Sequence, residues 1–371
     1  MIFDYRSIDE YQIEITSFCN AACPQCPRNE LGAGINPHMP LTHLPRAVID
    51  HAFAPELCER LRQVFFCGSY GDPIMHPDFK EVLRDFRKKN PTLWLYVHTN
   101  GGVHDPDYWS EIADIMAGYG QIDFGIDGVG DTLSVYRRNV KFSKVIENAQ
   151  AFIKAGGRAQ WNFIVFRHNE HQVTEAQAMS KELGFHDILI RNTGRFMHHE
   201  TLTEMSYWPV SDGSQLKPPK DSRYQNRSMR FLPRLKKQFP NIGEYFDTTV
   251  IHCDALLGNK VAINAEGLVL PCNFFNHNLY DQRFHDRTCL PGSHDLSFVN
   301  DRNQVRSFLE SFGLHNLNIK HRPLSGIFSN TMWQALVDSW QKTISGGRLF
   351  ECAMTCGQKL TKVWDQGGNN R

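Results

Sequence analysis

Strand-like and helix-like segments alternate along this chain from residue 11 to about 191, and this order limits the folds available to it. The segments with the pattern of a strand are Tyr11–Thr16, Gln63–Phe66, Leu93–His98, Gln121–Ile126, Ala159–Phe166 and Asp187–Arg191. The segments with apolar residues at helical spacing are Pro77–Lys89, Asp107–Tyr119, Phe142–Ala155 and Gln172–Leu183. Gly156, Gly157 and Gly184 follow the last two helices and can end them. Repeated βα units predict a parallel sheet that binds ligands at the carboxyl ends of its strands.

Three cysteines, Cys19, Cys23 and Cys26, follow the first strand-like segment in the run Cys-Asn-Ala-Ala-Cys-Pro-Gln-Cys. Three thiolates on one tight loop can hold three irons of a cubane cluster and leave the fourth iron open. Zinc sites more often pair two Cys-x-x-Cys units, and no second pair lies nearby. Three cysteines cannot all pair among themselves as disulfides, and no secretory signal precedes them. The loop therefore predicts an iron–sulfur cluster, with coincidental buried cysteines as the alternative.

A second motif stands after the apolar run Val64–Phe66, where residues 68–73 read Gly-Ser-Tyr-Gly-Asp-Pro. The cysteine loop and this motif together resemble the radical S-adenosylmethionine (SAM) superfamily. In that family the three-cysteine loop follows the first barrel strand, and a Gly-Gly-Glu-Pro-type motif follows the second. Here Asp72 stands in the place of the glutamate. The resemblance implies an α/β fold whose first domain, residues 1–195, is a partial (β/α)6 TIM-type barrel.

The resemblance also implies two cofactors at the cysteine loop, a [4Fe-4S] cluster and SAM. In the family, the open iron chelates the amino and carboxylate groups of SAM, and an electron from the cluster cleaves it. The resulting 5′-deoxyadenosyl radical abstracts hydrogen from the substrate, while the protein supplies position and excludes water. Gly71, Asp72 and Pro73 are expected to present oxygens to the SAM ammonium group. A simple tight turn is the alternative for these residues.

Residues 125–137 read Gly-Ile-Asp-Gly-Val-Gly-Asp-Thr-Leu-Ser-Val-Tyr-Arg, which resembles the Ser-Ile-Asp-Gly…Tyr-Arg stretch of SPASM-type enzymes. The arginine of that stretch pairs with the SAM carboxylate, a bidentate task suited to guanidinium. Arg137 inherits this expectation, with a surface ion pair, or Arg138 as the true partner, as alternatives. Asp127 ends the fourth strand, where it is expected either to meet the ribose or to cap the next loop.

Asparagines also stand near the ends of predicted strands. Asn100, in the run His-Thr-Asn-Gly, and Asn162, on the fifth strand, are expected to point into the barrel mouth. Asn192 follows the sixth strand. Each of the three is equally suited to contact a ligand or to make structural hydrogen bonds in a turn or in the core.

Three residues depart from the family pattern. The residue before the third cysteine is usually aromatic and packs on the adenine of SAM, and here it is Gln25. The serine of the fourth strand is replaced by Gly125. In the anaerobic sulfatase maturases an aspartate after the second auxiliary cysteine serves as a base, and this chain has Asn273. The first two changes alter SAM packing, and the third weakens any assignment to that enzyme's chemistry.

The last third of the chain carries further cysteines, among them Cys253, Cys272, Cys352 and Cys356. Strand-like residues 261–264 and 267–270 flank a turn beside them and predict a hairpin. This arrangement resembles the SPASM/Twitch extension, where a hairpin and a C-terminal segment bring four cysteines around an auxiliary [4Fe-4S] cluster. The cysteines are too few for two auxiliary clusters, so the resemblance implies a single-cluster, Twitch-like α+β domain over residues 251–371. Four thiolates would close such a cluster, which favours electron transfer or architecture over substrate binding.

Two features leave alternatives open. Cys289 is a spare cluster ligand, a catalytic hydrogen donor or a thiol without a special role, and we favour the last. Residues 196–250 break the βα order, and Gln215–Gln238 within them carries eight Lys and Arg against one Asp. This stretch is either a basic lid for an anionic substrate or leader peptide, or a solvated linker with one short helix. We favour the linker.

Charge and hydropathy exclude several classes of function. The 371 residues include 40 Lys and Arg and 40 Asp and Glu, so the balance gives no case for nucleic acid or an acidic membrane. The 41% hydrophobic content is that of an ordinary globular protein. No run of 18 apolar residues occurs, and the polar start is neither a signal nor a transit peptide. A cytoplasmic protein without a membrane partner is expected.

These features predict a radical SAM enzyme of an oxidoreductase or peptide-modifying class. Extensions of the Twitch type most often accompany the modification of ribosomally made peptides, by epimerisation or crosslinking, so a peptide substrate is favoured. A small-molecule dehydrogenase is one alternative, and a non-catalytic iron–sulfur or zinc protein, such as an electron carrier or sensor, is another. The resemblance also implies an external reductant such as flavodoxin or ferredoxin. The residues do not choose among the substrates.

Overall fold

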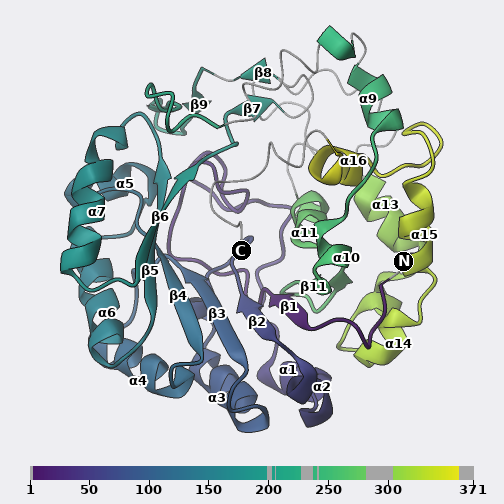
Figure 1. Ribbon diagram of the computed structural model, residues 1–371, viewed down its shortest axis with the longest axis horizontal. Coiled ribbons are helices and arrows are strands. Elements are labelled where there is room, and N and C mark those ends of the chain that lie inside the picture. Colours follow the sequence, from purple (N-terminus) through teal and green to yellow (C-terminus); the bar gives the residue numbers. More distant parts are fainter. Residues whose placement is uncertain are drawn as a thin grey trace.

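The computed structural model describes residues 3–198, 203–204, 206–226, 237–239, 242–280 and 304–358. Its centre is a curved sheet in which parallel strands follow one another in chain order (Figure 1). These strands are β1 (Glu10–Ile13), β2 (Gln63–Phe66), β3 (Trp94–Thr99), β4 (Gly120–Gly125), β5 (Ala159–Val165) and β6 (Asp187–Asn192). Parallel neighbours need a crossover between them, and the intervening helices supply it.

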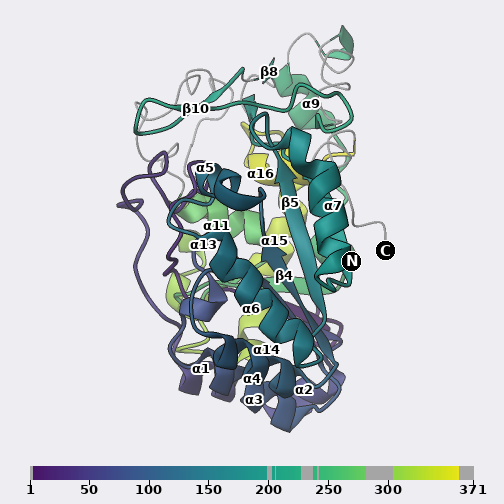
Figure 2. The ribbon, with the colours of Figure 1, turned by 90° about the vertical axis from the view of Figure 1, so that its left-hand side faces the viewer.

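Helices cover the outer face of this sheet, and Figure 2 shows α6 and α7 in front of β4 and β5. The helices of this part are α1 (Arg46–Ala52), α2 (Pro55–Arg60), α3 (Phe79–Lys89), α4 (Pro106–Met116), α5 (Leu133–Tyr136), α6 (Phe142–Lys154) and α7 (Val173–Glu182), with 3₁₀ turns η1 (Pro73–Met75), η2 (Gly130–Thr132) and η3 (Glu170–Gln172). Apolar rings fill the interface between helices and sheet. Phe66 of β2 packs against Phe79 and Phe86 of α3, with ring centroids 5.5 and 5.9 Å apart.

The inner face of the sheet is polar and partly open to solvent. Side chains alternate between the two faces of a strand, and in β3 the residues Tyr96 and His98 are partly exposed while Leu95 and Val97 are buried. Tyr96 donates to the Asp123 carboxylate of β4 over 2.6 Å, and the His98 Nε2 atom lies 3.1 Å from the same carboxylate. This face is therefore unlike the interior of a closed eight-stranded barrel, which side chains fill.

The C-terminal part adds strands to the same sheet. Strand β11 (Lys260–Ile263) pairs in parallel with β1, and β12 (Val269–Leu270) pairs antiparallel with β11, so the order is β12-β11-β1-β2-β3-β4-β5-β6. The helices here are α9 (Ile242–Thr248), α10 (Asp254–Leu257), α11 (Asn273–Tyr280), α13 (Gln304–Ser311), η4 (Leu314–Leu317), α14 (Leu324–Phe328), α15 (Met332–Ser339) and α16 (Phe350–Cys356). The N-terminal segment contacts this part, since the rings of Phe3 and Trp333 lie 5.0 Å apart.

Two small antiparallel pairs of strands lie between these parts in the sequence. They are β7 (Met197–His198) with β8 (Thr203–Glu204), and β9 (Trp208–Pro209) with β10 (Gln215–Leu216). Cys289 and residues 227–236 of the basic stretch lie outside the described residues. Within the part of the chain that the structure describes, none of the helices is long and apolar enough to cross a membrane.

The predicted α/β fold is confirmed. Strand β2 has the predicted bounds, and the other five barrel strands differ from the prediction by one to three residues at an end. The largest difference is in β1, which ends at Ile13 because Thr16 leaves the sheet to form an isolated bridge with His43. The predicted hairpin at residues 261–270 is present, and the sequence did not indicate that it pairs with β1.

Candidate functional site

The three cysteines lie in the loop that follows β1, and local hydrogen bonds fold this loop on itself. The Cys26 N–H donates to the Cys23 carbonyl over 3.0 Å, and the Cys19 Sγ atom accepts from the Ala21 N–H over 3.4 Å. The Arg28 Nε atom donates to the Ser17 carbonyl over 3.0 Å and anchors the far side of the loop. The short spacing of the cysteines in sequence thus becomes a short spacing in space.

The environment of these thiols is buried and charged. Burial raises the pKa of Cys23 to about 11, against the opposing effect of the Arg137 guanidinium. Burial also raises the pKa of Cys19, and the carboxylate of Asp72 and the other two cysteines add to the shift. A bound cation reverses this balance, because a coordinating thiol is deprotonated outright. The three thiols interact electrostatically and form one group.

The geometry of the cysteines bears on the kind of metal group that they could hold. Among the described residues, no three His, Cys, Asp or Glu side chains are placed to hold one ion. A zinc ion would need thiol ligands within about 2.3 Å of a single point. In a cubane cluster each cysteine binds a different iron, so the ligands do not converge on one point. The placement of these thiols is thus compatible with a cluster.

The loop of residues 68–73 lies directly against the cysteine loop. A Cβ atom at Gly71 would lie 1.9 Å from the Thr16 carbonyl oxygen, and one at Gly68 would lie 1.6 Å from the Gly71 carbonyl oxygen. Only glycine fits at these two positions, because the obstacles are backbone atoms that cannot move aside. The Asp72 N–H also donates to the Phe18 carbonyl over 2.8 Å. The second motif is thus fixed next to the first by backbone contacts.

Asp72 organises the loops around it. Its carboxylate accepts hydrogen bonds of 2.7 Å from both the backbone N–H and the side-chain amide of Asn100. The Asn100 amide also lies 3.7 Å from the Cys19 Sγ atom and donates to Asn20 over 2.9 Å. Burial raises the pKa of Asp72 despite these donors. Asp72 and Asn100 therefore lie together beside Cys19, and the Asp72 carboxylate is already occupied by N–H groups of the protein.

Arg137 lies on another side of the cysteine loop, beside Cys23. Its Nε atom is 2.6 Å from the fully buried carboxylate of Asp127, which also accepts from the Ile164 N–H over 2.6 Å. A Cβ atom at position 125 would lie 2.5 Å from an Arg137 terminal nitrogen. The departure at Gly125 thus has a physical reason, since the guanidinium occupies the space that a larger residue would need.

The neighbouring arginines have different tasks. Arg138 forms an ion pair of 2.6 Å with the exposed Asp212, so its guanidinium is directed to the surface. Arg195, which the sequence did not single out, donates to the Tyr136 hydroxyl over 2.8 Å and interacts electrostatically with Cys23 and Cys26. Its place three residues after β6, at the carboxyl end of a strand, was the signal that could have identified it.

The two remaining predicted residues, Asn162 and Asn192, have different surroundings. Asn162 accepts from the Arg191 Nε atom over 2.8 Å. Its register partner in β4 is Gly125, the residue beside which the Arg137 guanidinium lies. The Asn192 carbonyl accepts a long hydrogen bond of 3.5 Å from the Asn226 side chain, so its backbone contacts the segment that follows the barrel strands.

The four C-terminal cysteines come together from three separate segments. Cys253 precedes α10, Cys272 precedes α11, and Cys352 and Cys356 lie one turn apart on α16. A hydrogen bond between the thiols of Cys253 and Cys356 lowers the pKa of Cys253 and raises the pKa of Cys356. Burial raises the pKa of Cys272 to about 12, with the Cys253 thiol and Glu351 adding to the shift. The predicted auxiliary ligands therefore form a single group of thiols.

Helix α11, which begins directly after Cys272, contacts the loop of residues 68–73. The Tyr70 hydroxyl donates to the His277 carbonyl over 2.7 Å, and the Ser69 hydroxyl donates to the side chain of Asn273. The departure at Asn273 therefore has a structural role, because its side chain fixes Ser69. The two groups of cysteines are joined by this helix.

Glu14 completes the junction between the loops. Its carboxylate accepts from the backbone N–H groups of Tyr70 and Gly71 over 2.5 and 3.0 Å, and from the Asn276 side chain over 2.6 Å. Burial raises the pKa of Glu14 to about 7, although these hydrogen bonds oppose the shift. Sequence reasoning missed this residue because its partners lie 56 to 262 positions away along the chain.

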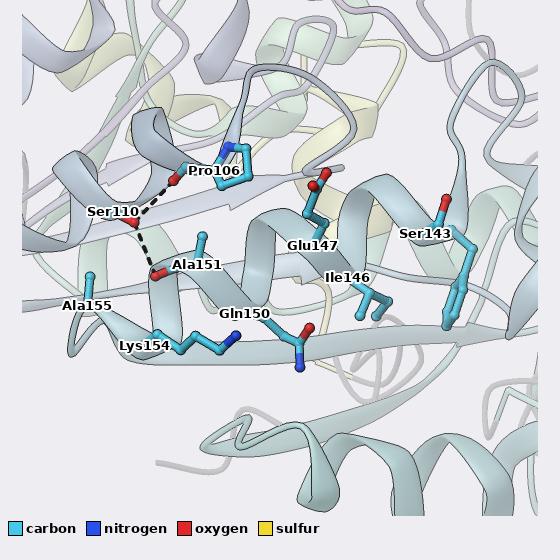
Figure 3. Close-up of a pocket in the computed structure, with 10 residues that line it drawn as sticks. Pro106, Ser110, Ser143, Ile146, Glu147, Gln150, Ala151, Lys154 and Ala155 are labelled. Carbon is cyan, nitrogen blue, oxygen red and sulfur yellow. Dashed lines mark hydrogen bonds between the residues drawn. The ribbon is translucent and has the colours of Figure 1, made fainter.

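A groove elsewhere on the molecule does not belong to this site. It has a volume of about 810 Å³ and lies between α4 and α6, in the helical layer outside the sheet. The Ser110 hydroxyl of α4 donates to the carbonyls of Pro106 and Ala151 over 3.1 and 3.5 Å, and all three residues line the groove (Figure 3). None of the cysteines lines this groove.

The residues around the first three cysteines fit a cluster with SAM. Three thiols would supply iron ligands, and the guanidinium of Arg137 would meet an anion beside them. The side chain of Gln25, inside the cysteine loop, is buried, and its two amide atoms have no hydrogen-bond partner among the described residues. An orphaned buried amide of this kind is expected where a ligand supplies the missing partner.

Comparison with known proteins identifies a family to which part of the chain is similar. The family profile of the Radical SAM superfamily matches residues 13–177, the segment that holds the cysteine loop, the loop of residues 68–73 and Arg137. No curated protein sequence matches the chain. The predicted family resemblance is confirmed over the matched residues, which include the strands β1 to β5.

Solved structures share the fold at low sequence identity. A histidine-tagged form of anSMEcpe with bound AdoMet is 13% identical with a TM-score of 0.53, over 98% of this chain and 88% of that one. Streptococcus suis SuiB bound to precursor peptide SuiA is 14% identical with a TM-score of 0.50, over 93% and 75%. SuiB bound to S-adenosylmethionine is 16% identical with a TM-score of 0.49, over 72% and 60%. The chain thus spans 60% of the length of that SuiB structure.

Proposed function

Because residues 13–177 form a radical SAM domain, we propose that this protein is an enzyme that binds SAM at an open [4Fe-4S] cluster held by Cys19, Cys23 and Cys26. The observation that carries the proposal is the placement of two polar pairs beside these thiols. Asp72 with Asn100 lies next to Cys19, and Asp127 with Arg137 lies next to Cys23. When bound, the cluster and SAM would supply a 5′-deoxyadenosyl radical for hydrogen abstraction.

The protein's own residues have distinct tasks in this proposal. Arg137 would hold the SAM carboxylate, because one edge of its guanidinium remains after the Asp127 pair is made. Arg195 would balance the negative charge of the thiolates of Cys23 and Cys26. Asp72 would act through the loop it organises, since its carboxylate is occupied by Asn100.

The second group of cysteines supports an auxiliary cluster. Cys253, Cys272, Cys352 and Cys356 would close a [4Fe-4S] cluster with four thiolates and leave no iron open. Helix α11 connects this group with the loop of residues 68–73, which is consistent with electron transfer or with architecture. An external reductant of the flavodoxin or ferredoxin kind would supply the electrons.

The substrate we propose is a peptide. Two structures that share the fold are complexes with a peptide: SuiB bound to precursor peptide SuiA, and native anSMEcpe with bound AdoMet and Kp18Cys peptide. The partly exposed, polar inner face of the sheet offers hydrogen-bonding groups to such a chain. Epimerisation or crosslinking of a ribosomally made peptide is the proposed class of reaction.

The test is the reductive cleavage of SAM. Anaerobically reconstituted protein is incubated with SAM and dithionite, and the release of 5′-deoxyadenosine is followed by chromatography. We expect release from the wild-type protein and none from a Cys23→Ser variant. A wild-type protein that contains its iron but releases no 5′-deoxyadenosine would refute the enzyme and leave an iron–sulfur carrier or sensor. Addition of a candidate peptide then separates peptide modification from small-molecule chemistry, because the true substrate increases the release.

A further inference from the structure

One indole in the C-terminal part lacks the kind of partner that four other indoles have. The indole N–H groups of Trp109, Trp161, Trp208 and Trp333 each donate to a backbone carbonyl, over 3.1, 2.7, 3.0 and 2.9 Å. The indole nitrogen of Trp340, the residue directly after α15, is buried and has no partner within hydrogen-bond geometry among the described residues. A buried donor of this kind costs free energy unless another group accepts from it.

The group beside this nitrogen is the thiol of Cys352, one of the four C-terminal cysteines. The Trp340 indole acts as a donor toward the Cys352 sulfur and opposes the rise that burial causes in the pKa of Cys352. The contact falls short of a full hydrogen bond, since a thiol is a weak acceptor. A thiolate carries negative charge, and hydrogen bonds to charged acceptors are shorter and stronger. The same N–H can therefore close on the sulfur once Cys352 is a thiolate.

Neighbouring charges act on the Cys352 sulfur in opposite senses. The Arg348 guanidinium is only 3% exposed, donates to the Phe246 carbonyl over 2.9 Å and interacts electrostatically with Cys352. Glu351, the residue before Cys352, contributes to the raised pKa of the Cys352 thiol. These two charges offset each other in part, and the Trp340 indole adds a neutral donor that favours negative charge on the sulfur.

We infer that the Trp340 indole N–H donates a hydrogen bond to the Cys352 sulfur when the C-terminal thiolates hold an iron–sulfur cluster, and that it stabilises the reduced state of that cluster. This inference rests on the proposed function, because it assumes the auxiliary cluster. Reduction adds negative charge to the cluster and its sulfur ligands, so a donor beside one of these sulfurs raises the reduction potential. Trp340 is thus a positioning residue that acts through Cys352 and favours the acceptance of an electron by this cluster.

The test measures the reduction potential of the auxiliary cluster. Full-length protein with alanine at the three cysteines of the first loop is reconstituted anaerobically, with and without Trp340→Phe, which removes the N–H and keeps an aromatic ring. Electron paramagnetic resonance follows the reduction at a series of fixed potentials, and the titration is repeated on protein with all its cysteines. The matched control is Trp333→Phe on α15, because the Trp333 indole donates to the Ile327 carbonyl instead of a sulfur.

A second measurement reports the contact itself. The protein is labelled with ¹⁵N in its tryptophan indoles, and pulsed electron paramagnetic resonance of the reduced cluster detects a ¹⁵N nucleus that is hydrogen-bonded to a cluster sulfur. Iron analysis of each variant establishes that the cluster is present.

We expect Trp340→Phe to lower the equilibrium constant for reduction of the auxiliary cluster roughly tenfold, the effect of one lost hydrogen bond to a charged acceptor. For a one-electron couple this is a fall of ~59 mV in the reduction potential. Trp333→Phe should leave the potential unchanged. The ¹⁵N coupling should be present in the protein with both indoles and in Trp333→Phe, and absent from Trp340→Phe.

An unchanged potential in a Trp340→Phe protein that contains its iron would overturn the inference, and so would a ¹⁵N coupling that persists in that variant. If Trp340→Phe does not retain iron, the labelled protein with both indoles decides, because the absence of any ¹⁵N coupling there excludes the contact. Loss of all iron from the protein with alanine at the first three cysteines would contradict the auxiliary cluster of the proposed function itself. That result is distinguishable, since no potential can then be measured.

Discussion

The two groups of cysteines in this protein are built in opposite ways. Cys19, Cys23 and Cys26 lie within eight consecutive residues, and their loop is shaped by its own hydrogen bonds. The C-terminal thiols come from three segments that only the packing of α10, α11 and α16 brings together. The first group is therefore a local structure, whereas the second joins separate segments of the chain.

Both groups of cysteines have charged neighbours of both signs, since Asp72 lies near Cys19 and Arg348 interacts with Cys352. Guanidinium groups of Arg137 and Arg195 lower the pKa of Cys23, against the effect of its burial. Near the second group, Glu351 adds to the rise that burial causes in the pKa of Cys352. Positive groups suit a site that must also bind a carboxylate, whereas a site closed by four thiolates needs no anion-binding group. In the proposed function, the two guanidinium groups beside Cys23 serve this purpose in the first group.

The strongest test of this contrast removes one group at a time. A Cys19→Ala/Cys23→Ala/Cys26→Ala variant and the variant with Ala at all four C-terminal positions should each retain about half of the wild-type iron. Only the second should change its electron paramagnetic resonance spectrum when SAM is added, because only it keeps the open iron. Iron analysis of the purified proteins provides the measurement. Loss of all iron from the first variant would remove the auxiliary cluster from the description.

The next test breaks the contact between the cysteine loop and the loop of residues 68–73. Gly71→Ala would place a Cβ atom 1.9 Å from the Thr16 carbonyl oxygen. We expect the free energy of unfolding to fall by about 3 kcal/mol, with a parallel loss of SAM binding. Gly34→Ala is the control, since its Cβ would come no closer than 3.4 Å to a side-chain oxygen, and a change of at most about 0.5 kcal/mol is expected. Denaturant titration measures the free energy of unfolding of both variants. Equal losses would show that the backbone at Gly71 and Thr16 can move apart to accept a side chain.

The smallest expected effect concerns the junction between the two regions. Glu14 has a pKa raised to about 7, so the folded state binds its proton more tightly than the unfolded state. Its contribution to stability is therefore present below about pH 4.5 and is lost as the pH rises through about 7. Across this window the wild type should lose about 1–3 kcal/mol relative to Glu14→Gln, which cannot ionise.

Unfolding at a series of pH values between 5 and 8 measures this loss. Glu147→Gln, at an exposed position on α6, serves as the control and should follow the wild-type curve. If Glu14→Gln follows that curve as well, the carboxylate is ionised throughout and the junction is not linked to pH.

Much of the barrel could be predicted from the sequence because its signals are local. The alternation of apolar residues located each strand to within a few positions, and β2 was located without error. The cysteine loop was recognised from the spacing of three residues. Gly156 and Gly184 end their helices with φ angles of 88° and 83°, which glycine adopts without strain.

The choice between neighbouring residues was made by the tertiary structure. The sequence offered both Arg137 and Arg138, and only the fold directs one to Cys23 and the other to Asp212. Arg195 and Glu14 went unrecognised because nothing near them in sequence marks them. Asn273 appeared only as a missing base until its contact with Ser69 was visible.

What the sequence by itself determined is the order of strands and helices and the three-thiol loop, because hydrophobic periodicity and short ligand spacing act over a few residues. The tertiary structure decided which distant residues meet: the C-terminal thiols, the pairing of β11 with β1, and the contact of Asn276 with Glu14, 262 positions apart. Such contacts depend on how whole helices and strands pack, and no local pattern of residues encodes that packing.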